Sequence, residues 1–119
     1  QTVNVTVNNV GPTNAAVAVS AAGTVTDADN VNTTYTIGAG NYNYTINGFD
    51  AGGDKLVGPA GVTPTVINSN FTDGQVTVQW AIDGSNIVQV TLAGLTTAQD
   101  QAILGLNSLN NTLGAGTVA

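Results

Sequence analysis

Large apolar residues recur at every second position along two neighbouring stretches of this chain, a pattern that leaves few folds open to it. Residues 76–82 and 88–92 carry an apolar side chain at every second position, and Asp83-Gly84 begins the connection between them. Successive side chains of a strand point to opposite faces, so this period indicates two strands that each bury one face. An Asp-Gly turn between such runs predicts a β-hairpin, with Trp80 in the core.

The same period of two occurs at the N-terminus. In residues 2–10, Val3, Val5 and Val7 share one face of the expected strand, and Gly11-Pro12 ends the run. Further strands are expected where Val, Thr and Tyr cluster between turn residues: 15–30, 32–37, 42–46 and 62–71. The glycine-rich connection between the middle two of these predicts a second hairpin.

The period changes near the C-terminus. Between residues 97 and 110, apolar side chains recur every three or four positions, after Thr96 or Thr97 as a helix cap. One amphipathic helix over 97–110 is therefore predicted. Taken together, the patterns predict a single domain over 1–119, mostly β: a Greek-key-like β-sandwich of about seven to nine strands with one short C-terminal helix.

The amino-acid inventory excludes several classes of function. The chain contains no His, Cys, Met, Glu or Arg, and charged residues make up 7% of it. Without His or Cys, His-assisted nucleophilic catalysis and ordinary zinc, copper or haem sites are excluded. We therefore expect no catalytic residues and no enzyme. A net charge of −6 argues against nucleic-acid binding. No apolar run approaches the roughly 20 residues of a membrane helix, so membrane insertion is not expected.

Sulfur is absent from this chain as well. Without Cys or Met it has no easily oxidised sulfur, which suits a protein that works where no cellular reductant repairs damage. We accordingly expect an extracellular location, at a bacterial cell surface.

The stretch YTINGFDAGGDKLVGP places Ile46, Phe49, Asp50, Asp54 and Leu56 around a run of glycines. It resembles an element of type I secreted, RTX-related bacterial surface and adhesin proteins, in which a strand runs into the pattern I-x-x-F-x-x-G-x-D-x-(I/L) near the C-terminal end. The charge-poor remainder of the chain is similar to the tails of such proteins, so the resemblance covers about residues 42–119 and implies a secreted surface protein. The nonapeptide repeats that define the RTX calcium roll are missing, so it implies no calcium site of that kind.

Two polar stretches carry candidate metal ligands. Asp50 and Asp54 flank glycines, and Asp27, Asp29 and Asn30 lie close together in TDADN. Two interpretations stay open for both stretches. The side-chain oxygens either satisfy backbone N–H groups of a turn, or they bind calcium, which prefers hard oxygen ligands. No other cofactor is expected.

The expected N-terminal strand is uncharged, and it has no Lys, Pro or bulge of the kind that usually protects a strand edge from pairing with another chain. Val3, Val5 and Val7 therefore have two interpretations. They belong either to an ordinary strand of the domain, or to a donor strand over residues 1–10 that completes the sheet of a neighbouring copy. Tyr42 and Tyr44 also have two interpretations, as core residues or as an exposed pair that stacks on glycans.

These observations favour a secreted bacterial structural protein. Its copies would assemble into a filament or surface layer, with the chain itself as partner and the N-terminal strand as the connection. The alternative is a calcium-stabilised adhesin or glycan-binding module of a larger type I secreted surface protein, with surface glycans as partners.

Overall fold

The computed structural model describes residues 13–27 and 31–119. Within them the chain forms eight strands and two short helices, which confirms the prediction of a mostly β chain with about seven to nine strands. The elements are β1 (Thr13–Val19), β2 (Gly23–Thr26), β3 (Val31–Ile37), β4 (Tyr42–Asn47), β5 (Lys55–Val57), β6 (Thr65–Ile67), β7 (Val76–Ala81), β8 (Ile87–Ala93), α1 (Thr97–Ala102) and α2 (Leu106–Leu113).

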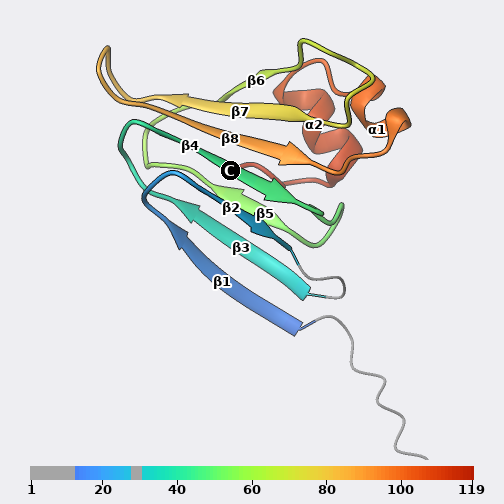
Figure 1. The fold of residues 1–119 in the computed structure, drawn as a ribbon, viewed down its shortest axis with the longest axis horizontal. Coiled ribbons are helices and arrows are strands. Elements are labelled where there is room, and N and C mark those ends of the chain that lie inside the picture. The colour runs from blue at the N-terminus through green and yellow to red at the C-terminus, as the bar shows by residue number, and fades with distance from the viewer. Residues whose placement is uncertain (1–12, 28–30) are drawn as a thin grey trace, which may run out of the picture.

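The strands belong to two sheets (Figure 1). One sheet has three strands in the order β1-β3-β5, and the other has five in the order β2-β4-β8-β7-β6. From β1 to β5 the chain alternates between the sheets, so β3, β4 and β5 each pair in parallel with the strand two positions earlier. We call β1 with β2 the first rung of this winding, and β3 with β4 the second rung.

The Greek-key prediction is wrong. A Greek key is built from antiparallel neighbours, whereas β1–β3, β2–β4, β3–β5 and β4–β8 are parallel pairs. Antiparallel pairing joins β7 to β6 and to β8, and the second of these pairs is the predicted hairpin of residues 76–82 and 88–92. Residues 38–41, in contrast, carry the chain from one sheet to the other, so β3 and β4 do not form the second predicted hairpin.

One core cluster contains side chains of both sheets. Tyr35 comes from the three-stranded sheet, while Ile46 and Trp80 come from the five-stranded sheet, and all three are almost completely buried. The predicted core position of Trp80 is confirmed. At the margin of this apolar layer lie Val17 of β1 and Val25 of β2, which are only partly buried. The first rung therefore ends the core.

The C-terminal residues pair with the outer edge of β5. Val118 forms a parallel bridge with Leu56. The N–H of Leu56 donates to the carbonyl of Thr117 at 2.7 Å, and the N–H of Ala119 donates to the carbonyl of Leu56 at 2.9 Å. This edge of the three-stranded sheet is therefore closed by the chain itself.

Two helices replace the single helix predicted over 97–110. α1 begins at a predicted cap, because Oγ1 of Thr96 accepts a hydrogen bond from the N–H of Gln99 at 3.1 Å. α1 spans six residues. The hydroxyl of Ser108 then accepts hydrogen bonds from the N–H groups of Leu104 and Gly105, at 2.7 and 2.9 Å, at the start of α2. This second cap divides the periodic stretch, although the spacing of its apolar residues continues.

Candidate functional site

The part of the chain that the structure describes encloses no pocket. None of its helices combines the length and the apolar character that crossing a membrane requires. Two other features remain as candidate sites, namely a group of carboxylates at the ends of the two rungs and the outer edge of the first rung.

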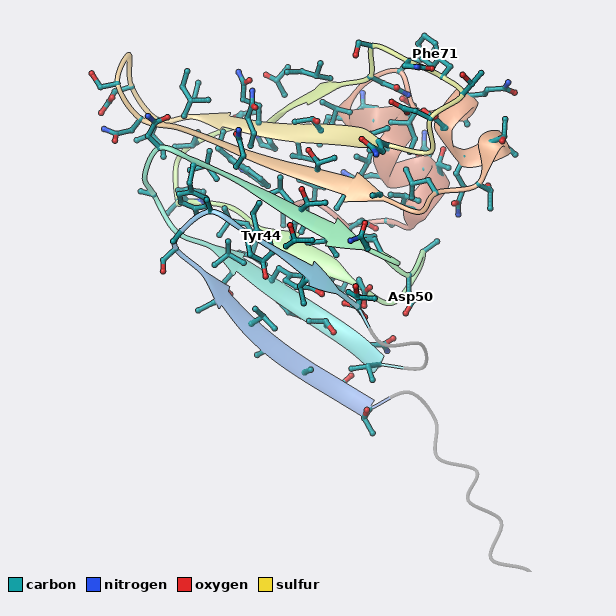
Figure 2. All side chains as sticks on the ribbon, in the orientation of Figure 1. Tyr44, Asp50 and Phe71 are labelled. Atoms are coloured by element: carbon teal, nitrogen blue, oxygen red, sulfur yellow. The ribbon has the colours of Figure 1, made fainter. Side chains whose placement is uncertain are left out.

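Three carboxylates meet where two successive turns of the chain come together. Asp27 directly follows β2, and Asp50 and Asp54 lie in the loop between β4 and β5; Asp50 is labelled in Figure 2. One oxygen atom of each of the three lies within 4.8 Å of the others. We call these three residues the acidic cluster. Asp27 of TDADN and the two aspartates of the glycine loop, which the sequence offered as separate candidates, thus form one group.

Sheet pairing places the three carboxylates together. The N–H of Asp27 donates to the carbonyl of Asn47 at 2.8 Å, which extends the parallel pairing of β2 with β4 by one residue. The chain then turns back through Gly52, whose φ of 80° is a conformation that glycine adopts without strain. The N–H of Asp54 donates to the carbonyl of Asp50 at 3.0 Å and closes the loop.

Asp54 holds this loop against the second rung. Its Oδ1 accepts a hydrogen bond from the N–H of Thr33 at 2.9 Å, and its Oδ2 accepts one from the N–H of Asp50 at 2.7 Å. Asp54 is 1% exposed. Burial raises the pKa of Asp54 to about 6; the charges of Asp27 and Asp50 also raise it, whereas the two backbone hydrogen bonds lower it.

Asp27 is bound at one oxygen and not at the other. Its Oδ2 accepts a hydrogen bond from the hydroxyl of Tyr35, and burial together with this contact raises the pKa of Tyr35. Oδ1 is enclosed and has no hydrogen-bond partner within residues 13–27 and 31–119. The sequence analysis did not identify Tyr35 as part of a site, since its alternation with Thr33 and Ile37 indicates only a buried strand face.

Asp29 and Asn30, the other two candidate ligands, lie outside the described residues, and so do Val3, Val5 and Val7 of the expected donor strand. Their assigned roles stay predictions.

Tyr42 and Tyr44 lie on the same face of β4 as the buried Ile46, and both pack against the core. Tyr44 is labelled in Figure 2. The hydroxyl of Tyr42 donates to the carbonyls of Gly38 and Val19, at 2.6 and 3.0 Å. This side chain therefore connects the end of β1 in the first rung with the residue after β3 in the second rung. Burial raises the pKa of Tyr42. A sugar-stacking platform needs open ring faces, so the structure supports the core interpretation of this pair better than the glycan interpretation.

The first rung forms an open end of the molecule. Both β1 and β2 are outermost strands of their sheets, and within the described residues each pairs on one side only. Figure 1 shows β1 at one end of the molecule and the two helices at the other. β1 is seven residues long, carries no charge and is mostly exposed. Its Ala15 and Val17 share a face with the buried Val19, and of these Ala15 is exposed and Val17 half-buried.

The other sheet edges are protected. The C-terminal residues pair with β5, and β6 is only three residues long and contacts α2. Short edge strands and covering helices are common ways of keeping a sheet edge from pairing with another chain. The sequence analysis predicted strand structure in residues 15–30, which overlaps β1, but it assigned the unprotected edge to residues 2–10 and did not identify β1 as an edge strand.

Comparisons with protein-family models, with curated proteins and with solved structures find no match to this chain. Its function is therefore inferred from the geometry of its own residues.

Proposed function

We propose that this chain is a structural protein of the bacterial exterior, whose copies assemble through the open end. One observation carries the proposal: within the described residues both strands of the first rung lack a partner on their outer side, whereas the opposite edges are closed or covered. A strand edge with free N–H and carbonyl groups binds a further strand from another chain.

Pairing at this edge has favourable energetics. A strand added beside β1 forms backbone hydrogen bonds that contribute roughly 1 kcal/mol each, net of the lost bonds to water. It also covers Ala15 and Val17, and each buried CH₂ group contributes about 0.8 kcal/mol. Neither β1 nor β2 carries a charge, so the contact buries no ionised side chain of either strand.

We assign residues 2–10 of a second copy as the strand that pairs with β1. Existing neighbours in this sheet are parallel. Two parallel strands of one chain need a connection of about a dozen residues or more, and only Gly11 and Pro12 separate residues 2–10 from β1. A parallel strand beside β1 therefore comes from another copy, whose Val3, Val5 and Val7 then extend the apolar layer.

In this arrangement each copy donates its N-terminal strand to β1 of the next copy, so the copies associate head to tail. A head-to-tail contact that does not close into a ring produces an open filament. The composition supports this use, because a chain with 7% charged residues, and no Cys or Met, has little charge repulsion between copies and no sulfur to oxidise outside the cell.

A second candidate function is a calcium-stabilised adhesin module of a larger surface protein. The acidic cluster is the observation that favours it, and a glycan would be the ligand of such a module. Because Tyr42 and Tyr44 pack against the core, the self-assembling protein has the better structural support.

Two variants of the N-terminal stretch test the assembly. In the first, Val3, Val5 and Val7 are replaced by Ser, and in the matched control Asn4, Thr6 and Asn8 are replaced by Ser on the opposite strand face. Sedimentation velocity and negative-stain microscopy over a wide concentration range should show filaments for the full chain and the control, and monomers for the first variant.

A full chain that stays monomeric at high concentration overturns this proposal. So does equal assembly of both variants. Hydrogen exchange identifies the competing arrangement, because amides of residues 2–10 that are protected in a monomer mean that this segment pairs antiparallel with β1 of its own chain.

A further inference from the structure

We propose that Asp27, Asp50 and Asp54 bind one Ca²⁺ ion, at the point where the residue after β2 meets the loop between β4 and β5. This inference does not depend on the proposed assembly. It rests on the geometry of the acidic cluster and on the environment of Asp27.

The spacing of the three carboxylates fits a single calcium ion. Ca²⁺ binds oxygen ligands at about 2.3–2.6 Å, so two ligands on opposite sides of the ion lie up to about 5 Å apart. One oxygen from each of the three residues lies within 4.8 Å of the others. Mg²⁺ binds at about 2.0–2.1 Å, demands near-ideal octahedral geometry and usually keeps several waters, so a site built from several protein carboxylates favours Ca²⁺.

Asp27 independently indicates a ligand. The residue is 7% exposed, and its Oδ1 is enclosed without a hydrogen-bond partner within the described residues. An unpaired carboxylate oxygen removed from water is strongly unfavourable unless a hydrogen bond or a metal ion compensates for the lost hydration. Tyr35 occupies the other oxygen, so a cation bound to Oδ1 would supply the missing interaction.

The negative charge of the acidic cluster also favours a bound cation. The chain contains one Lys and neither Arg nor His, so it has few positive side chains that could neutralise three neighbouring carboxylates. A divalent cation of the hard class offsets two of these three negative charges directly. Softer metals are disfavoured, because this site offers oxygen ligands and the chain has no His or Cys to contribute nitrogen or sulfur.

Asp54 remains able to act as a ligand despite its hydrogen bonds. Each of its oxygens accepts one backbone N–H, from Thr33 and from Asp50. A carboxylate oxygen has about two acceptor positions, so one position on each oxygen is left for the ion. These two bonds also fix the orientation of the carboxylate before the ion arrives. Bound Ca²⁺ would then connect the first rung to the loop that follows the second rung.

The test uses the full chain after treatment with EDTA, titrated with CaCl₂ in a calorimeter and melted with and without CaCl₂. We expect one Ca²⁺ per chain and a higher melting temperature with calcium, because a ligand that binds only the folded state stabilises it. The same titration with MgCl₂ should give clearly weaker binding.

Two substitutions locate the site. Asp27→Asn keeps the shape of the side chain and an acceptor for Tyr35 but removes the charge, and it should weaken calcium binding by about tenfold or more. Asp73→Asn is the control, since Asp73 is exposed and its Oδ1 accepts only a local bond from the N–H of Gln75 at 3.0 Å. This control should bind calcium as the unchanged chain does.

The proposal is overturned if the EDTA-treated chain takes up no calcium at millimolar concentration, or if Asp27→Asn binds it as tightly as the unchanged chain. Circular dichroism shows whether Asp27→Asn folds. If it does not, Asp50→Asn is the substitute, because Asp50 lies in the loop and its N–H still donates to Asp54. Unchanged affinity in that variant overturns the proposal equally.

Discussion

A methyl group built on Cα of Gly58 would lie 2.0 Å from Nε1 of Trp80. Gly58 follows β5 of the three-stranded sheet, and Trp80 lies on β7 of the five-stranded sheet. The two sheets therefore approach each other here so closely that no side chain fits between them.

This contact predicts that Gly58→Ala destabilises the protein. The added methyl group must displace the indole of a fully buried Trp80, and such overpacking typically costs about 1–3 kcal/mol. Gly84→Ala is the matched control, because the same methyl group there meets no atom within 4 Å. In urea unfolding, the Gly58→Ala variant should have a lower midpoint concentration than the unchanged chain, and the Gly84→Ala variant should not. Equal midpoints for the two variants would contradict the close approach of the sheets.

A second prediction concerns Asn68, which joins the loop after β6 to α1. Its Nδ2 donates to the carbonyl and to Oδ1 of Asp100, at 2.8 and 2.9 Å, and to the carbonyl of Ile103 at 2.9 Å. Asp100 is fully buried. In Asn68→Asp a carboxylate faces these three oxygen atoms, so the free energy of unfolding should fall by about 3 kcal/mol or more.

Asn70→Asp is the control for this charge change. Asn70 is exposed, and its Oδ1 accepts from the N–H and hydroxyl of Thr72 at 3.0 and 2.9 Å, contacts that a carboxylate preserves. We expect a change within about 0.5 kcal/mol. Chemical unfolding of both variants is the measurement, and similar losses in the two would mean that Asn68 does not hold the helix through its amide.

The strands themselves were largely predictable, whereas most of their pairing was not. The alternation of residues 76–82 and 88–92 correctly predicted the hairpin of β7 and β8. Residues 32–37 and 42–46 show the same alternation, yet β3 and β4 belong to different sheets. Two strands with one apolar face each bury it equally well side by side or across a core, so the period of two does not distinguish a hairpin from a connection between sheets.

The residues of the candidate site could be predicted from the sequence, but their convergence into one cluster could not. Asp50 and Asp54 were identified from a glycine-rich loop, and Asp27 from the polar stretch TDADN. Their convergence depends on the parallel register of β2 with β4, in which Val25 pairs with Ile46, and a non-local register leaves no local pattern in the sequence. The same limit applies to β1, which is an edge only because of the order of the strands.

The raised pKa of Asp54 makes a third prediction, for the protein in EDTA. A carboxyl whose pKa rises from 3.8 when unfolded to about 6 when folded binds its proton more tightly in the folded state. The folded state therefore gains stability from this group below pH 3.8 and loses that gain as the pH rises through about 6. The free energy of unfolding should decrease across this window.

Guanidinium unfolding at a series of pH values measures this dependence, and Asp54→Asn should flatten it because that side chain does not titrate. Asp83 has a lowered pKa, owing mainly to its hydrogen bonds from the side chain of Asn86, so its effect falls below the window of Asp54. A stability that rises between pH 4 and pH 6 would contradict the assigned environment of Asp54.

The last prediction uses two adjacent alanines of β1 to separate assembly from folding. Ala15 and Ala16 are both exposed, but Ala15 lies on the face that continues toward the buried Val19, and Ala16 lies on the opposite face. In Ala15→Lys the charge points into the layer that an incoming strand would cover, which is how natural edge strands prevent pairing. We expect self-association to weaken by at least about tenfold, which corresponds to about 1.4 kcal/mol.

Ala16→Lys adds the same charge on the outer face and should assemble as the unchanged chain does. Both variants should unfold at the same denaturant concentration as the unchanged chain, since exposed substitutions change stability by about 0.5 kcal/mol or less. Sedimentation velocity compares the two, and an equal loss of assembly in both would show that net charge, and not strand pairing at β1, controls the association.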